Sequence, residues 1–189
     1  HITPETAVLE LGCGTGYYAT CFAPMCREYV GVDISPENIA LFKEKIRQQG
    51  LKNVHAHIGD ATRLRGMPDK AFDVVLCLGP LYHLPPEERD CVLAECRRLC
   101  RDGGVAAFAY INKVGVYTGA CVHDRLRAYY PSEQANKWVL SCGRDDVKPD
   151  LFFYTMPEEI EAAAGKKGFH KIKNLGTDFF IAMSIIDAM

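Results

Sequence analysis

The sequence lacks the features that mark a membrane-spanning or nucleic-acid-binding protein. No apolar run approaches the roughly 20 residues that span a bilayer. The 22 basic and 24 acidic residues are mixed along the chain, with no block of like charge and a net charge of −2. We therefore predict neither a membrane nor a nucleic acid among the partners.

The sequence also lacks the spacing typical of metal and redox sites. None of the nine cysteines forms a C-x-x-C pair, and no secretory leader opens the chain. We interpret the cysteines as reduced thiols of a cytoplasmic protein, most of them small core residues. His55 and His57 alternate on one predicted strand without an evident third ligand, so we predict no metal site.

Neither end of the sequence carries a clear start or stop signal. The chain opens on His1, an apolar run follows almost at once, and Met189 ends another apolar stretch. We expect further sequence at both ends. The length suits a single domain, residues 1–189, with a sizeable core.

Short apolar runs alternate with helical patterns along the chain. We predict strands at Ala7–Leu11, Tyr29–Asp33, Val54–Ile58, Phe72–Leu78, Val105–Ile111 and Phe169–Leu175. We predict helices at 16–23, 36–49, 85–101 and 157–167, with Asp102-Gly103-Gly104 ending the third. Strands separated by helices imply right-handed crossovers. The predicted fold class is therefore α/β, a doubly wound and mostly parallel sheet.

Residues 112–150 interrupt this alternation of strands and helices. The segment carries several aromatic residues, among them the only tryptophan, Trp138. A segment of this length between regular elements usually has a function or a structure of its own. We predict that it is an insertion that caps the substrate site.

The distinctive residues follow the predicted strands. Three glycines, Gly12, Gly14 and Gly16, come after the first strand, and Asp33 ends the second. Gly59-Asp60 follows the third strand, and Gly79–Leu84 follows the fourth. Ligands of a doubly wound sheet bind at the carboxyl ends of its strands. We therefore expect these loops to converge on one cleft.

Two cofactor classes suit such a cleft, and the residues favour one of them. A dinucleotide site needs G-x-G-x-x-G, but position 17 is Tyr17, so that pattern fails. Asp33 is placed to accept hydrogen bonds from ribose hydroxyls, and Asp60 from an adenine amine. The other class is S-adenosylmethionine, which has a methionine tail and no pyrophosphate. Glu10 would suit the ammonium of that tail better than phosphates, which its charge would repel.

Five ordered motifs together resemble class I S-adenosylmethionine-dependent methyltransferases. They are V-L-E-L-G-C-G-T-G at 8–16, G-V-D-I-S at 31–35, G-D-A at 59–61, F-D-V-V-L-C-L-G at 72–79 and D-G-G-V at 102–105. The segment G-P-L-Y-H-L at 79–84 resembles a bacterial subgroup that acts on small molecules. Members of the family usually close the sheet with a seventh strand. We expect this chain to lack that strand and an N-terminal lid helix.

The resemblance implies a role for each matching position. The implied cofactor-binding residues are Glu10, Gly12, Cys13, Gly14, Gly16, Asp33, Ile34, Asp60, Ala61, Cys77 and Leu78. Tyr82 and His83 would face the departing methyl group, with His83 as the candidate general base. Simpler interpretations stay open: a structural partner for Glu10, a turn for Asp60, a capping loop for His83 and packing for Tyr82.

The predicted function is methyl transfer from S-adenosyl-L-methionine to an unidentified acceptor, a small molecule, with S-adenosyl-L-homocysteine as product. Two alternatives remain: a catalytically inactive cofactor-binding or regulatory protein of the same fold, and an NAD-dependent oxidoreductase. The sequence selects neither the acceptor atom nor an oligomeric state.

Overall fold

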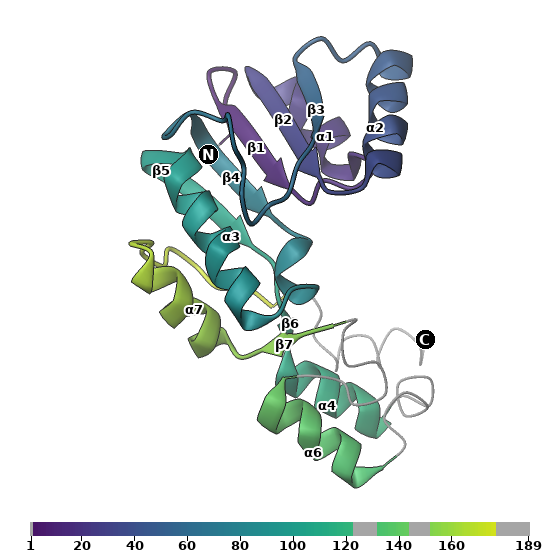
Figure 1. Cartoon of the computed structure of the whole chain (residues 1–189), viewed down its shortest axis with the longest axis vertical. Helices are drawn as coiled ribbons and strands as arrows, with labels where there is room; N and C mark the ends of the chain where they lie inside the picture. Colours follow the sequence, from purple (N-terminus) through teal and green to yellow (C-terminus); the bar gives the residue numbers. More distant parts are fainter. Residues whose placement is uncertain (1, 123–131, 144–151, 177–189) are drawn as a thin grey trace, which may run out of the picture. The chain divides into compact units, whose positions relative to one another are not determined.

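The computed structural model describes residues 2–122, 132–143 and 152–176 (Figure 1). The chain forms two compact units, His1–Ala109 and Tyr110–Met189. The single domain expected for residues 1–189 stays a prediction. No helix in the described part of the chain is both long and apolar enough to cross a membrane.

The first unit contains a five-stranded parallel sheet, which confirms the predicted fold class. Its strands are β1 (Ala7–Leu11), β2 (Glu28–Asp33), β3 (Val54–Ile58), β4 (Phe72–Cys77) and β5 (Cys100–Phe108). Their spatial order is β3-β2-β1-β4-β5. The chain runs outward from β1 to β3 and then returns to place β4 on the other side of β1. This reversal creates a switch point between β1 and β4.

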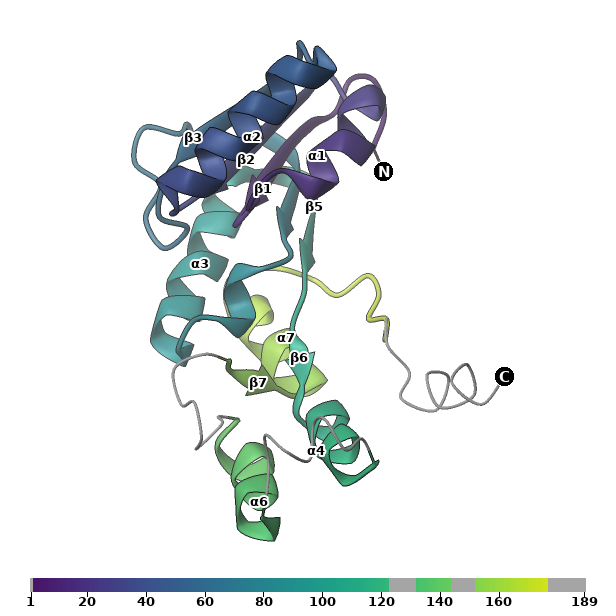
Figure 2. The same ribbon diagram turned by 90° about the vertical axis from the view of Figure 1, so that its right-hand side faces the viewer.

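Helices cover the two faces of this sheet (Figures 1 and 2). They are α1 (Tyr17–Phe22), α2 (Pro36–Gln49) and α3 (Pro86–Leu99), with short 3-10 turns at Ala23–Met25 and Pro80–Tyr82. Residues of α1 and α2 share a buried cluster with Val8 of β1 and Tyr29 of β2. Cys96 of α3 hydrogen-bonds Cys77. The register puts Cys77 on the opposite sheet face, because side chains alternate along a strand.

Helix α2 shows how local signals set the bounds of an element. The Ser35 side chain accepts a hydrogen bond from the Asn38 N–H at 3.1 Å, and Pro36 occupies the first helical position. Gly50 ends the helix in the left-handed conformation, with φ 63°. The predicted bounds of this helix are confirmed.

The predicted end of the third helix and the bounds of the fifth strand are wrong. Helix α3 ends at Leu99, and Asp102-Gly103-Gly104 lie within β5 instead of stopping the helix. The register of β4 with β5 shifts between Phe72 and Val74. Gly103 lies beside this irregularity with φ 74°. A left-handed glycine is what a β-bulge uses, so the glycine pair bends a strand here.

The second unit contains three helices and a short parallel pair of strands in its described part. The helices are α4 (Lys113–Val122), α6 (Glu133–Cys142) and α7 (Pro157–Lys166), and the strands are β6 (Ile111–Asn112) and β7 (Tyr154–Thr155). Buried Val139 and Tyr154 form its core with Ile111, Val116 and Phe152. The described part of residues 112–150 therefore contains two helices of its own, and the helix predicted at 157–167 is confirmed.

The strand predicted at Phe169–Leu175 does not form. These residues have no regular structure, and most of them are exposed, including Ile172 and Leu175. A strand needs a neighbouring strand for its backbone groups, and no strand of the described chain pairs with residues 169–175. The expected absence of a seventh strand falls largely on residues 177–189, which lie outside the described residues.

One carboxylate joins three elements of the second unit. Glu159 Oε1 lies 2.7 Å from Nζ of Lys113, which is buried. Glu159 Oε2 accepts hydrogen bonds from the Thr155 hydroxyl and the Met156 N–H, both at 2.9 Å. Glu159 thus connects the start of α7 to β7 and to the start of α4.

We predict that Glu159→Gln destabilises the second unit by about 2 kcal/mol, because the change leaves the buried Lys113 ammonium without its counter-charge. Hydrogen exchange of the amides of α4 and β7 measures the effect. Glu158→Gln is the matched control, since it removes a neighbouring charge from the same helix turn. Equal protection in both variants would contradict the role of Glu159.

Candidate functional site

The loops after β1 and β4 meet at the carboxyl edge of the sheet. All three glycines of the first loop have positive φ: 69° at Gly12, 53° at Gly14 and 73° at Gly16. A Cβ built on Gly12 would lie 2.6 Å from the ring carbons of Pro80. Glycine at this position therefore allows close contact between the two loops.

Gly16 and Gly14 meet different surroundings. A Cβ on Gly16 would lie 2.1 Å from the ring of Phe42, a fully buried residue of α2. A Cβ on Gly14 would have no heavy atom within 4 Å. Packing therefore demands glycine at position 16. At position 14 only the left-handed backbone does, and the backbone there faces open space.

Asp33 connects the glycine loop to the start of α2. Its Oδ2 accepts a hydrogen bond from the Gly14 N–H at 2.8 Å. Its Oδ1 accepts from the Ser35 N–H at 2.9 Å and from the Asn38 side-chain amide at 3.2 Å. A carboxylate has about four acceptor positions. The contacts thus leave one acceptor position on Oδ2.

Glu10 lies buried beneath the glycine loop with a partner inside the protein. Its Oε2 accepts a hydrogen bond from the Tyr29 hydroxyl at 2.5 Å. Burial raises the pKa of Glu10 from its ordinary 4.5 to about 7, assisted by the nearby Asp33 charge and opposed by the Tyr29 hydrogen bond. Burial, then the charges of Glu10 and Asp33, raises the pKa of the neighbouring Cys13 thiol. Cys13 is therefore a neutral core residue.

The loop after β3 presents Asp60 at the surface. Asp60 Oδ1 accepts hydrogen bonds from the Thr62 N–H at 2.8 Å and the Thr62 hydroxyl at 2.7 Å. This contact is a side-chain turn, which leaves Oδ2 without a contact in the described chain. Ala61 is half-buried, and Ile34 after β2 is 70% exposed. An apolar side chain and a carboxylate oxygen thus both remain accessible here.

The end of β4 supplies Cys77, Leu78, Tyr82 and His83. Cys77 is fully buried, and its carbonyl accepts a hydrogen bond from the Ala109 N–H at 3.0 Å. Leu78 is half-buried. The Tyr82 and His83 rings pack against each other with centroids 4.7 Å apart, and His83 is exposed. The roles of all four residues stay predictions.

Sequence reasoning missed four residues that position this site. Tyr29 holds Glu10, Phe42 packs on Gly16, and Asn38 holds Asp33. The ammonium of Lys45 donates to the Thr15 carbonyl of the glycine loop at 2.6 Å. One signal was available: Glu10 is the one polar residue of the otherwise apolar strand β1. The other contacts depend on how α2 packs.

The described residues contain no group of three His, Cys, Asp or Glu side chains able to hold a metal ion. The seven cysteines of the first unit are free thiols, and five of them are buried.

Comparison with known proteins gives a consistent family. Residues 8–104 match the family described as the methyltransferase domain. The ubiquinone biosynthesis O-methyltransferase of Methylococcus capsulatus is 30% identical over 151 residues, which are 72% of this chain and 62% of that protein. The uncharacterized methyltransferase YcgJ of Bacillus subtilis is 32% identical over 99 residues, which are 52% of this chain and 38% of that protein. The chain thus spans less than two thirds of either relative.

A solved structure with the same fold comes from Methanosarcina mazei. This SAM-dependent methyltransferase matches with a TM-score of 0.69 at 19% identity, covering 93% of this chain and 87% of that one. At this identity the similarity concerns the fold alone.

The raised pKa of Glu10 predicts a pH dependence of stability. The folded protein holds this proton up to about pH 7, whereas the unfolded chain releases it near 4.5. Stability from Glu10 is therefore full below pH 4.5 and falls as pH rises toward 7. Between pH 5 and pH 8 the loss is about 2–3 kcal/mol.

Urea unfolding of the native protein and Glu10→Gln at both pH values measures this difference, since the variant lacks the titrating group. Glu87→Gln, which removes an exposed carboxylate of α3, is the control. If Glu10→Gln and the native protein show the same loss of stability between pH 5 and pH 8, the burial argument fails.

The glycine contacts predict unequal effects of alanine. Gly16→Ala should destabilise the protein by about 3 kcal/mol or more, because the added methyl group overpacks the core and the left-handed backbone is strained as well. Gly14→Ala should cost about 1 kcal/mol, because only the backbone strain applies. Gly50→Ala is the matched control, since φ is 63° there and a Cβ also meets nothing within 4 Å. Urea unfolding should rank Gly16→Ala far below the other two, and equal losses would refute the packing argument.

Proposed function

The chain belongs to the class I S-adenosylmethionine-dependent methyltransferase family, and from this premise we propose that it binds S-adenosylmethionine at the carboxyl edge of the sheet. We further propose that it transfers the methyl group to a small-molecule acceptor. The premise rests on the family match over residues 8–104.

The observation that carries the proposal is the hydrogen bond from the Gly14 N–H to Asp33 at 2.8 Å. It fixes a carboxylate with one remaining acceptor position beside the loop segment that faces open space. A ribose hydroxyl can donate to that position on Oδ2. The sugar then lies next to Gly14, where an added side chain would intrude.

The other loops supply matching groups for the rest of the cofactor. Ile34 offers an exposed apolar surface to adenine, and Asp60 Oδ2 can accept from its amine. Gly12, Gly14 and Gly16 and the backbone of Leu78 would line the methionine portion. Glu10 would act on the methionine portion from beneath the loop, since the Tyr29 hydroxyl holds its carboxyl group there.

The charge of the site suits a cationic tail. Glu10 and Asp33 place two carboxyl groups around the glycine loop. The Asp33 carboxylate would repel a pyrophosphate, whereas it would attract an ammonium or a sulfonium, and such a cation would favour the ionised form of Glu10. This arrangement disfavours the alternative of an NAD-dependent oxidoreductase, as Tyr17 does in the sequence.

The bound cofactor supplies an activated methyl group on a sulfonium. The protein has to orient the acceptor and keep water away, which is where such a reaction gains most. His83 can take a proton from the acceptor, and Tyr82, packed against the His83 ring, orients it. The names of the relatives include an O-methyltransferase of ubiquinone biosynthesis, which favours a small-molecule acceptor without selecting its reactive atom.

Binding of S-adenosylhomocysteine tests the proposal. We expect micromolar affinity for it and no measurable binding of NAD(H) by isothermal titration. Asp33→Ala should weaken binding about ten- to a hundred-fold, because it removes a charged acceptor from the ribose. Asn38→Ala is the control, since it removes a hydrogen bond to Asp33 but leaves the carboxylate. NAD(H) binding without S-adenosylhomocysteine binding would reject the proposal.

Turnover is tested separately with S-adenosylmethionine and a pool of metabolites, by following formation of S-adenosylhomocysteine. His83→Ala should bind the cofactor normally and turn over slowly. Cofactor binding without any turnover by the native protein would favour the alternative of an inactive regulatory protein.

A further inference from the structure

One crossover of the first unit has no helix. Residues 59–71, which connect β3 to β4, form only turns and extended segments. Parallel strands are usually joined through a helix that covers the sheet. The sheet face beside this connection is therefore only partly covered, and both His55 and His57 of the edge strand β3 are exposed.

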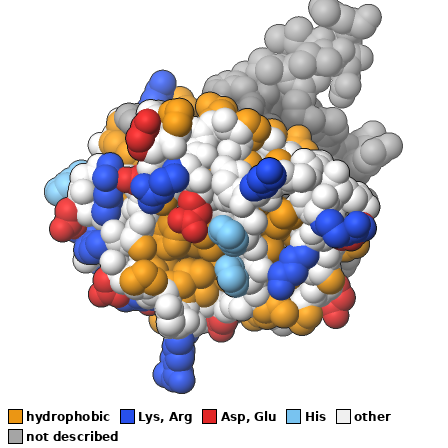
Figure 3. Space-filling view, turned by 90° about the horizontal axis from the view of Figure 1, so that it is seen from above, with side chains coloured by type: hydrophobic (Ala, Val, Ile, Leu, Met, Phe, Trp, Pro, Cys, Tyr) orange, Lys and Arg blue, Asp and Glu red, His pale blue; other side chains and the backbone are white. Residues whose placement is uncertain are grey.

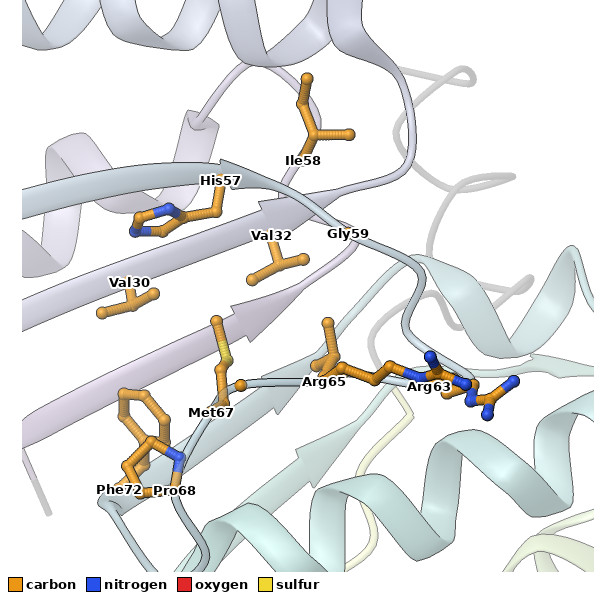
Figure 4. A pocket seen from close by; sticks show the side chains of 12 residues that line it. Val30, Val32, His57, Ile58, Gly59, Arg63, Arg65, Met67, Pro68 and Phe72 are labelled. Carbon is orange, nitrogen blue, oxygen red and sulfur yellow. The ribbon is translucent and has the colours of Figure 1, made fainter.

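A groove of about 600 Å³ lies between this connection and the sheet. Val30 and Val32 of β2 form its floor, and Met67, Pro68 and Phe72 form a wall (Figure 4). Val30, Val32 and Phe72 are each less than 10% exposed, so the accessible apolar surface of the groove comes from half-buried Met67 and exposed Pro68. This end offers apolar surface that a ligand can cover.

The other end of the groove is basic. Arg63 and Arg65 line it, and Figure 4 shows their side chains away from Pro68 and Phe72. Both arginines are exposed, and neither has an acidic partner in the described chain. Nearby cations differ: Arg98 binds Asp69 and Glu95, and Lys70 binds Asp102. Within the described chain, the positive charge of Arg63 and Arg65 is thus not paired with an acidic side chain.

On the face seen from above, hydrophobic side chains gather beside histidine side chains, with both acidic and basic side chains around them (Figure 3). His57, whose imidazole can donate a hydrogen bond, also lines the groove (Figure 4).

We propose that this groove binds a small amphipathic anion, with an apolar body against Met67 and Pro68 and an acidic group on Arg63 and Arg65. The volume lies in the range of small-molecule pockets. Guanidinium groups pair with carboxylate and related anions in a bidentate manner. The two arginines and the apolar surface together favour a ligand that carries both an acidic group and an apolar body.

The groove lies on the other face of β2 from the glycine loop, although both β2 and the loop after β3 contribute to the groove and to the proposed cofactor site. Val32 and Asp33 are consecutive on β2, so their side chains point to opposite faces of the sheet. Asp33 holds the glycine loop on one face, and Val32 lines the groove on the other. The inference therefore does not depend on the proposed methyl transfer.

Fluorescence of 8-anilinonaphthalene-1-sulfonate, an aromatic anion, tests the proposal. We expect saturable binding that excess S-adenosylhomocysteine does not displace and that sodium decanoate, an aliphatic anion, does. Arg63→Gln/Arg65→Gln should weaken binding about tenfold or more. Arg27→Gln/Lys52→Gln is the matched control, because it removes two exposed cations elsewhere on the unit.

A neutral probe separates the two ends of the groove. N-phenyl-1-naphthylamine lacks the sulfonate, so its binding should be unchanged in the arginine variant. Met67→Glu should weaken the binding of both probes, because it places a charge in the apolar wall of the groove. Thermal unfolding checks that each variant remains folded.

Three results would overturn the proposal. The first is equal binding of the sulfonate by the arginine variant and its control. The second is displacement of the probe by S-adenosylhomocysteine, which would place it in the other site. The third is loss of a dimer on sedimentation of the arginine variant, which would assign the groove to a second copy of the chain.

Discussion

The left-handed turn after β1 is the constraint on which the site depends. Gly12 and Cys13 both donate to the Val32 carbonyl, at 2.8 and 3.0 Å, so the loop folds back over the end of β2. It can do so only with positive φ at alternate positions, which glycine adopts without strain. Contacts with Pro80 and Phe42 then fix the loop from two sides, and Asp33 holds its middle. The loop is thus positioned before any ligand arrives.

The two carboxyl groups near this loop are held in different ways. Asp33 receives three hydrogen bonds from the protein and keeps one acceptor position. Within the described chain, Glu10 accepts one side-chain hydrogen bond, from Tyr29, and lies deeper, so burial raises its pKa to about 7. Environment therefore separates two residues of similar chemistry, as in many enzyme sites. A cation above the loop would favour ionised Glu10, which links ligand charge to a buried proton.

The sequence predicted the elements whose signals are local. The bounds of β1, β3 and α2 are as predicted. The apolar residues of the two strands mark their extent, and a serine cap, a proline and a terminal glycine bound the helix. Asp102-Gly103-Gly104 carries an equally clear local signal, yet pairing with β4 turns it into a bulge. Phe169–Leu175 has a composition typical of a strand, but no strand of the described chain pairs with it. Pairing is a property of the fold, so a single segment cannot reveal it.

The same distinction holds for the site. Glycines and carboxylates at strand ends could be placed from the sequence, because parallel strands bring their carboxyl ends to one edge. Tyr29 and Phe42 could not, because their contacts depend on sheet register and helix packing. The groove on the opposite face follows from a missing feature, the helix between β3 and β4, and from the alternation of Val32 with Asp33. β2 thereby contributes Val32 to the groove and Asp33 to the glycine loop, so a substitution at one position leaves the other side chain in place.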